Sequence, residues 1–167
     1  MNTVLTSPES ALAEAIFARG RSIAEVIENQ VAQSQTSIDA AVHRLNSQRL
    51  ARALADARER GVRVRLVIDR SKYEKSVATR KLLSACALPF RIGCGRDGPE
   101  SKMHHKFALL DNRLVITGSY NWTFASESRN HENILLLRER GLVEIFRREF
   151  DALWTSPETS DSTEGRS

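Results

Sequence analysis

The residues best suited to chemistry lie close together in the second half of this 167-residue chain. They form the pattern His-x-Lys-x4-Asp-x6-Gly-Ser-x-Asn, whose named positions are His104, Lys106, Asp111, Gly118, Ser119 and Asn121. A neutral imidazole is a nucleophile, and an ammonium group two residues away attracts a phosphate oxygen. Hydroxyl and amide side chains donate further hydrogen bonds. Together these groups suit a tetrahedral anion such as a phosphodiester.

A β-hairpin is the element that the sequence predicts for positioning these groups. Residues 104–110 contain no strand breaker, residues 111–113 are turn formers, and residues 114–117 read as a return strand. Because side chains alternate faces along a strand, His104 and Lys106 should share one face. Glycine after the return strand leaves room for another backbone to approach closely.

Two carboxylates are candidates for supporting roles. Asp111 belongs to the motif and so counts among the candidate catalytic residues, but its odd offset from His104 points it away on a continuous strand. We therefore expect it to fix the turn, with a catalytic role left open. Glu132, just before an apolar run, is the better candidate to orient the His104 imidazole, because a carboxylate on the far ring nitrogen selects the tautomer.

The stretch resembles the HKD signature of the phospholipase D superfamily. The continuation Gly118-Ser119-Tyr120-Asn121-Trp122-Thr123, followed by Glu132-Asn133, is similar to its single-motif nuclease branch, which includes the bacterial endonuclease Nuc and Zucchini-type enzymes. The likeness spans residues 37–153. It implies an α/β fold with a mixed, largely parallel β-sheet flanked by helices, and one motif per chain.

The resemblance also implies a mechanism: metal-independent cleavage of a phosphodiester through a phosphohistidine on His104, with no cofactor. Attack needs a neutral imidazole and protonation of the leaving oxygen needs a charged one, so two histidines are required. Because the chain has one His-x-Lys motif, we expect a homodimer in which two His104 side chains meet across a two-fold axis. His105 and His131 are alternatives for the second histidine. The expected phosphate-binding side chains are Lys106, Ser119 and Asn121.

The substrate is less clearly indicated than the reaction. Residues 44–75 hold ten Lys or Arg and four Asp or Glu, a local charge of +6, whereas residues 1–43 carry a local charge of −3. A basic segment suits a polyanion, so the first hypothesis is an endonuclease that cleaves DNA or RNA. The alternatives are a phospholipase acting on an anionic phospholipid such as cardiolipin, and a nucleic-acid-binding module with little activity. Lys102 is a candidate for a second phosphate contact.

Length and composition predict one globular domain over residues 1–154 and a disordered polar tail over residues 155–167. No apolar run reaches the length of a membrane helix, so we expect no stable membrane insertion. The first 18 residues lack the basic start and apolar block of a secretory signal, which predicts a cytoplasmic protein. No Cys or His cluster has zinc spacing, and no carboxylate cluster suits a magnesium pair, so no metal site is predicted.

Periodicity predicts the remaining elements. Helices are expected over residues 22–35, 47–60, 77–87 and 141–154, and strands over residues 2–6, 37–45, 62–69, 88–92 and 132–137. Residues 10–18 read as a helix or a loop, residues 70–75 as a loop, and residues 93–103 as a loop that rims the site. The inward residues of the last helix are expected to be Leu142, Ile145, Phe146, Phe150, Leu153 and Trp154. Trp122 and Phe124 are expected in the core, with base stacking as the alternative. His43 and Arg44 lie where the family has a serine- or tyrosine-bearing strand.

Overall fold

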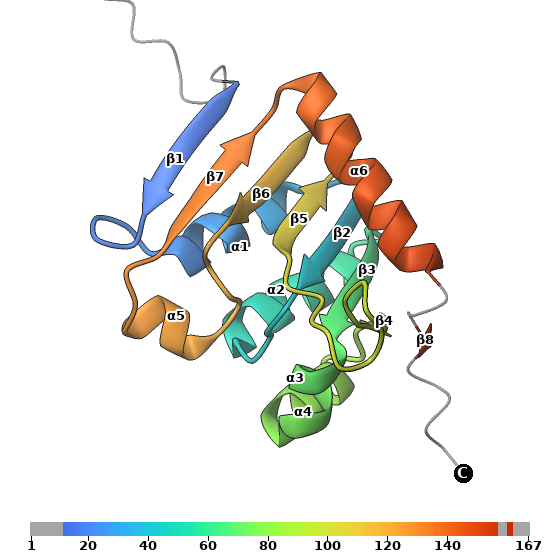
Figure 1. Ribbon diagram of the computed structural model, residues 1–167. Coiled ribbons are helices and arrows are strands. Elements are labelled where there is room, and N and C mark those ends of the chain that lie inside the picture. The colour runs from blue at the N-terminus through green and yellow to red at the C-terminus, as the bar shows by residue number, and fades with distance from the viewer. Residues whose placement is uncertain (1–11, 157–159, 162–167) are drawn as a thin grey trace, which may run out of the picture.

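A mixed β-sheet forms the centre of the molecule. The structure is a computed structural model and describes residues 12–156 and 160–161. Its strand order is β1-β7-β6-β5-β2-β3-β4-β8 (Figure 1). The strands are β1 (Ala13–Phe17), β2 (Ser37–Val42), β3 (Arg63–Asp69), β4 (Phe90–Gly93), β5 (Lys106–Leu110), β6 (Leu114–Gly118), β7 (Asn133–Leu137) and β8 (Ser160–Asp161). The helices are α1 (Ile23–Gln33), α2 (Gln48–Glu59), α3 (Arg70–Lys75), α4 (Val77–Ala85), α5 (Phe124–Ser128) and α6 (Arg140–Thr155).

The sheet confirms the α/β class and corrects one detail of it. β2, β3 and β4 pair in parallel, as their alternation with helices predicts. The other five pairings of the described strands are antiparallel, so the sheet is mixed but not largely parallel. The predicted hairpin accounts for one of these pairings, because the turn of residues 111–113 between β5 and β6 is too short for a parallel crossover.

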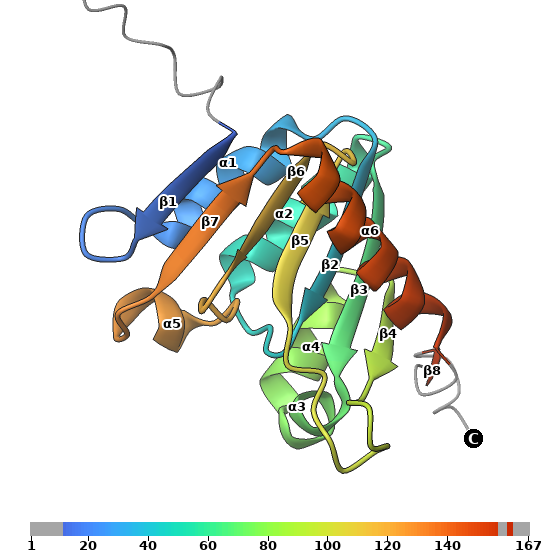
Figure 2. The same ribbon diagram turned by 45° about the horizontal axis from the view of Figure 1, so that its top comes forward.

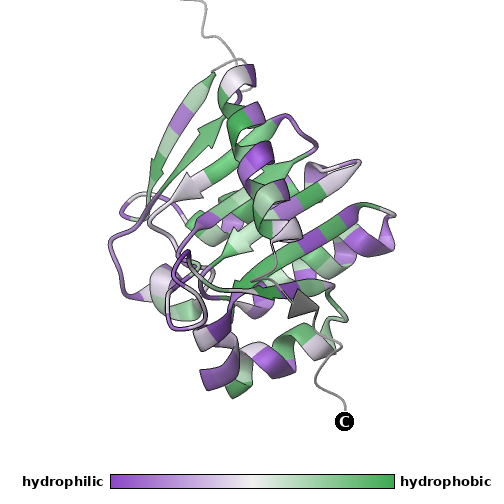
Figure 3. Cartoon of the chain, turned by 45° about the vertical axis from the view of Figure 1, so that its right-hand side comes forward, coloured by the Kyte–Doolittle hydropathy of each residue, from purple (hydrophilic) through white to green (hydrophobic). Residues whose placement is uncertain are grey.

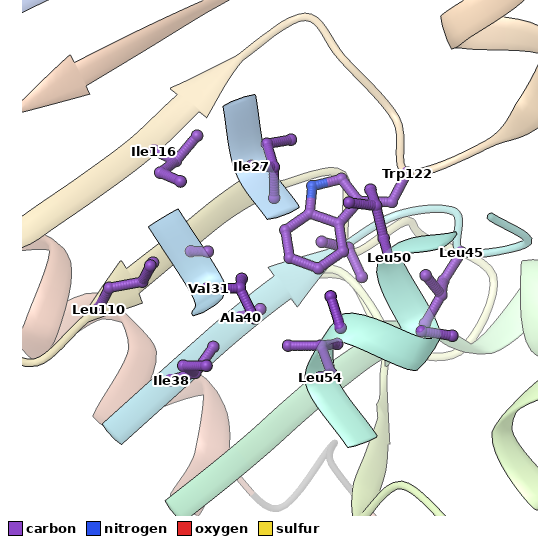
Figure 4. Packing of buried hydrophobic residues seen from close by; sticks show 14 of the residues in the cluster. Ile27, Val31, Ile38, Ala40, Leu45, Leu50, Leu54, Leu110, Ile116 and Trp122 are labelled. Carbon is purple, nitrogen blue, oxygen red and sulfur yellow. The ribbon is translucent and has the colours of Figure 1, made fainter. Parts of the chain in front are cut away.

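Helices cover both faces of the sheet. α1 and α2 lie side by side on one face, and α6 crosses the other (Figures 1 and 2). Each of the first two begins at a serine, where Ser22 accepts a hydrogen bond from the amide of Glu25 and Ser47 accepts one from Leu50. The main core fills the space between these helices and the sheet (Figure 4). Trp122 is buried in this core, as predicted.

α6 packs through a narrower face than the sequence suggests. Val143 and Phe150 are buried, whereas Leu142 and Ile145 are 40% and 61% exposed, so the inward orientation predicted for these two is wrong. Figure 3 shows hydrophilic and hydrophobic residues alternating along this helix. A single helix on a sheet buries only the stripe that faces the strands, which explains the difference. No helix in the described part of the chain is both long and apolar enough to span a membrane.

Two further segments differ from prediction, and two others lie wholly or mostly outside the described residues. Ala13–Phe17 is a strand rather than a helix or loop, because it pairs along its whole length with β7. Residues 70–75 form α3 rather than a loop, since the Asp69 side chain accepts from the amide of Lys72 and starts the helix. The strand predicted at residues 2–6 lies outside the described residues, as does most of the predicted tail. Within that tail, Ser160–Asp161 pairs with β4.

Candidate active site

The motif residues other than Asp111 gather at one edge of the sheet, where β2, β3 and β6 end and β5 and β7 begin, at the lower edge in Figure 1. Antiparallel pairing of β5 with β2 and β6 brings these ends together. The backbone amide of His43 donates to the carbonyl of His105 over 2.8 Å, and that of Ser119 donates to Asn133 over 3.2 Å. These bonds extend the sheet past its last paired residues and hold the loops that carry the side chains.

His104 and Lys106 are brought into direct contact. The Lys106 Nζ lies 3.3 Å from the His104 Nδ1 and 2.8 Å from the His104 carbonyl oxygen. Because an ammonium group only donates, this contact places the lone pair of the neutral ring on Nδ1 and its proton on Nε2. His104 is exposed and precedes β5, so its ring is open to a substrate.

The charges around His104 favour the neutral ring. Partial burial lowers the pKa of His104, and the positive charges of Lys106, Lys102 and Arg44 lower it further, against the opposing effect of Asp69. Burial likewise lowers the pKa of the Lys106 ammonium. A neutral imidazole next to several cations has the properties expected of a nucleophile that acts on an anion.

Ser119 and Glu132 form a pair of their own at this edge. The Ser119 hydroxyl donates to the Glu132 carboxylate and accepts from the amide of Asn133 over 3.2 Å. The other carboxylate oxygen of Glu132 accepts from the Asn130 side chain over 3.0 Å. Glu132 thus holds the loop between β6 and β7 together, and its predicted role as the group that orients His104 stays a prediction.

Asn121 lies in the same loop with an incompletely bonded side chain. Its Oδ1 is buried and has no hydrogen-bond partner among the described residues. An unpaired buried acceptor costs about 1–3 kcal/mol, so this side chain is not held there for stability. Its place next to Ser119 suits the predicted phosphate-binding role, which stays a prediction.

Asp111 is far from these groups, at the opposite end of β5. It accepts hydrogen bonds from the amides of Gln35, Thr36 and Ser37 and from the Thr36 hydroxyl. Burial alone would raise the pKa of Asp111, but these hydrogen bonds outweigh it and lower the pKa. The five residues of β5 span about 16 Å, at about 3.3 Å per residue, and Asp111 and His104 lie beyond its two ends. The structure therefore places Asp111 in a turn-fixing position, as its offset suggested.

Two residues at this edge have no assigned role in the sequence prediction. The buried His43 ring lies 4.4 Å from the His104 ring, measured between centroids. Asp69, also buried, accepts from the amide of Met103 over 3.0 Å and from the Ser71 hydroxyl over 2.7 Å. Asp69 therefore anchors the loop that leads into His104. The sequence does not show that His43 and Asp69 lie near His104, because this depends on how β2, β3 and β5 pair.

The two alternative second histidines differ in position. His105 packs edge-on against Phe107 at 5.4 Å, and its Nε2 is 3.1 Å from a carboxylate oxygen of Glu149 on α6, on the other face of the sheet. His131 is exposed in the loop before Glu132. In the part of the chain that the structure describes, no group of three or more His, Cys, Asp or Glu side chains is arranged to hold a metal ion.

The chain matches the family model described as "Cardiolipin synthase, PLD-like domain" over residues 27–154. It is similar to the mitochondrial cardiolipin hydrolases of Xenopus tropicalis, 35% identical over 122 residues, and Homo sapiens, 35% identical over 121 residues. These matches cover 73% and 72% of this chain, and 56% and 46% of the relatives. The chain thus spans about half the length of these curated relatives.

Solved structures share the fold. Nuc from Salmonella typhimurium, a phospholipase D family member, superimposes with a TM-score of 0.78 at 24% identity, covering 89% of this chain and 96% of Nuc. NucT from Helicobacter pylori gives a TM-score of 0.75 at 16% identity and covers 89% of this chain and 99% of NucT. At these identities the likeness shows the fold, which is the α/β architecture expected from the motif.

Proposed function

Since the chain belongs to the family of phospholipase D-like domains, we propose that it is a metal-independent phosphodiesterase that cleaves nucleic acid through a covalent intermediate on His104. One observation carries the proposal: the His104 ring lies 3.3 Å from the Lys106 ammonium at an open edge of the sheet, in surroundings that lower the pKa of His104. The combination supplies a nucleophile and a cation for the phosphate in one place.

Binding of the substrate would activate the nucleophile. A phosphate oxygen is a stronger acceptor for the Lys106 ammonium than a ring nitrogen, so the substrate would draw Lys106 away from His104. An unprotonated ring nitrogen of His104 then attacks phosphorus, forming the P–N bond as the P–O bond to the leaving oxygen breaks. Ser119 and Asn121 would donate to the other phosphate oxygens, after the Ser119 hydroxyl turns from Glu132.

A second histidine completes the cycle. A charged imidazole gives its proton to the leaving oxygen and then, now neutral, takes a proton from water as that water attacks phosphorus and breaks the P–N bond. Within the described chain, His105 faces the opposite side of the sheet and is paired with Glu149. The exposed His104 of a second copy is the simplest source, which makes the proposed enzyme a homodimer.

Charge and exposure favour nucleic acid as the substrate. Lys102 and Arg44 lie close enough to act on His104, and Lys72 acts on His43, so cations flank the nucleophile on several sides. Phe124 is 67% exposed, contrary to the predicted core position, and is available to stack on a base. Such an arrangement suits consecutive phosphates with intervening bases.

A phospholipid substrate is the second candidate. It is favoured by the cardiolipin hydrolases that are about one-third identical to this chain. An anionic headgroup and a nucleic-acid phosphate offer the same chemistry to His104 and Lys106, so the residues that catalyse the reaction would be shared.

Turnover by the purified protein in EDTA distinguishes these functions. Plasmid DNA, single-stranded DNA, RNA and cardiolipin vesicles are the substrates, and His104→Asn is the test variant. We expect nucleic-acid cleavage by the wild type and a loss of at least about 10³-fold in kcat for His104→Asn, with binding retained. His105→Asn is the matched control and should keep its activity. Turnover of lipid alone would overturn the choice of nucleic acid, and cleavage at the wild-type rate by His104→Asn would overturn the role of His104.

A further inference from the structure

His43 is a buried, titratable side chain that the mechanism above does not use. It follows β2 directly, and its backbone amide bonds to the carbonyl of His105, which fixes it beside the motif strand. Its ring is tilted by 55° against the ring of His104, with 4.4 Å between the centroids. The side chain is only 4% exposed, so His43 contacts the exposed His104 ring at a tilt from the buried side.

Both ring nitrogens of His43 are buried without a hydrogen-bond partner among the described residues. A phenylalanine would fill the same space without leaving two polar atoms unpaired. Polar atoms that lower stability, set against the proposed nucleophile, indicate a role in the reaction rather than in folding.

The groups that face His43 keep its ring neutral. Burial lowers the pKa of His43 to about 4, and the charges of His104, Lys106 and Lys72 act in the same direction, while Asp69 on β3 opposes them. At neutral pH His43 therefore offers one nitrogen lone pair that can accept a hydrogen bond. This is the role that the sequence predicted for Glu132, whose two carboxylate oxygens are engaged by Ser119 and Asn130.

We propose that His43 is a positioning residue for His104: its ring packs against the His104 ring, and one of its nitrogens accepts a hydrogen bond from His104 when a phosphate draws Lys106 away. The nitrogen of His104 that carries the proton then donates to His43, and the other nitrogen is left unprotonated for attack. The inference rests on the proposed function for its consequence in turnover. The hydrogen bond between the rings is testable without turnover.

Kinetics of three variants test the consequence. His43→Phe keeps a ring and removes the nitrogens, so we expect kcat to fall about 10- to 100-fold, with KM within about twofold and a melting temperature that does not decrease. His43→Asn and His43→Gln restore an acceptor near one nitrogen or the other, and at least one of them should be faster than His43→Phe. His105→Phe, on the opposite face of the sheet, is the control that should match the wild type. A His43→Phe enzyme with wild-type kcat would overturn the proposal.

NMR titration of the His104 ring protons in saturating inorganic phosphate, which draws Lys106 away from His104, tests the hydrogen bond itself. A neutral acceptor favours the charged form of its donor, so the pKa of His104 should be lower in His43→Phe than in the wild type. A purely structural role for His43 predicts no such change, and an unchanged titration of His104 would contradict the proposal. This readout also separates the two ideas: a wild type without phosphodiesterase activity would refute the proposed function, while the shift in titration would still decide the role of His43.

Discussion

At the scale of single residues, the surroundings of His104 would decide when it can act as the proposed nucleophile. Burial comes first among the causes that lower its pKa, followed by the charges of Lys106 and Lys102. The ring therefore stays neutral to a lower pH than an ordinary histidine, whose pKa is about 6.5. The cations proposed to attract the phosphate thus also favour the unprotonated form of the proposed nucleophile.

Removing one of these cations should move the pH dependence of the reaction. We expect the acid limb of kcat/KM to have its midpoint below pH 6.5 in the wild type and closer to pH 6.5 in Lys102→Gln, because loss of a nearby positive charge makes His104 easier to protonate. The measurement is the rate of cleavage from pH 4 to 9 for both proteins. Lys81→Gln, on α4, is the charge-matched control. An acid limb that stays in place in Lys102→Gln would contradict this account of the electrostatics.

At the scale of elements, close contact between β6 and β7 positions the Ser119 loop. A Cβ built on Gly118 would lie 2.3 Å from the carbonyl oxygen of Asn133, far closer than van der Waals contact. The prediction that this glycine permits a close backbone approach is therefore confirmed. The two strands must separate to accommodate any side chain at this position.

Gly118→Ala should therefore reduce both stability and activity. We expect the free energy of unfolding to fall by about 1–3 kcal/mol, because the clash is with backbone atoms, and kcat to fall with it as Ser119 moves. Denaturant unfolding and initial rates measure the two effects. Gly20→Ala is the matched control, since nothing lies within 4 Å of a Cβ there. A Gly118→Ala protein as stable and active as this control would show that the loop tolerates displacement.

Asp111 should affect the fold and spare the chemistry. Its carboxylate joins the β5–β6 turn to the start of β2 through the amides of Gln35, Thr36 and Ser37. We expect Asp111→Ala to lower the free energy of unfolding by about 1–3 kcal/mol, with kcat per folded molecule within about twofold of the wild type. Asp97→Ala, in an exposed loop, provides the control. A large fall in kcat with unchanged stability would make Asp111 catalytic.

The sequence predicts those parts of the fold that local signals determine. α1 and α2 are predicted well because their signals are local: a serine N-cap and apolar residues at helical spacing, all within the helix or next to it in sequence. β1 is missed because Ala13–Phe17 becomes a strand only by pairing with β7. His104 and Lys106 are found because they lie in one motif. His43 is missed, because its contact with His104 depends on the pairing of β2 with β5, whose paired residues are 64 or more positions apart in the chain.

At the scale of the whole molecule, the basic segment of residues 44–75 is less available to bind a polyanion than its sequence suggests. Arg65 and Arg63 form ion pairs with the buried Asp39, and Arg49 pairs with Glu28. These arginines stabilise the fold, so the attraction for a polyanion falls to the cations near the site. Lys102 and Arg44, which act on His104, belong to this second group.

We propose that two copies of His104 act together in one dimer. The most direct test is the activity of an equimolar mixture of wild type and His104→Asn after subunit exchange, with dimerisation checked by molecular mass. If cleavage needs both histidines, only the wild-type pairs are active, and the mixture should show about one quarter of the activity of the same total amount of wild type. An activity of about one half would mean that each chain works alone, and would contradict the account.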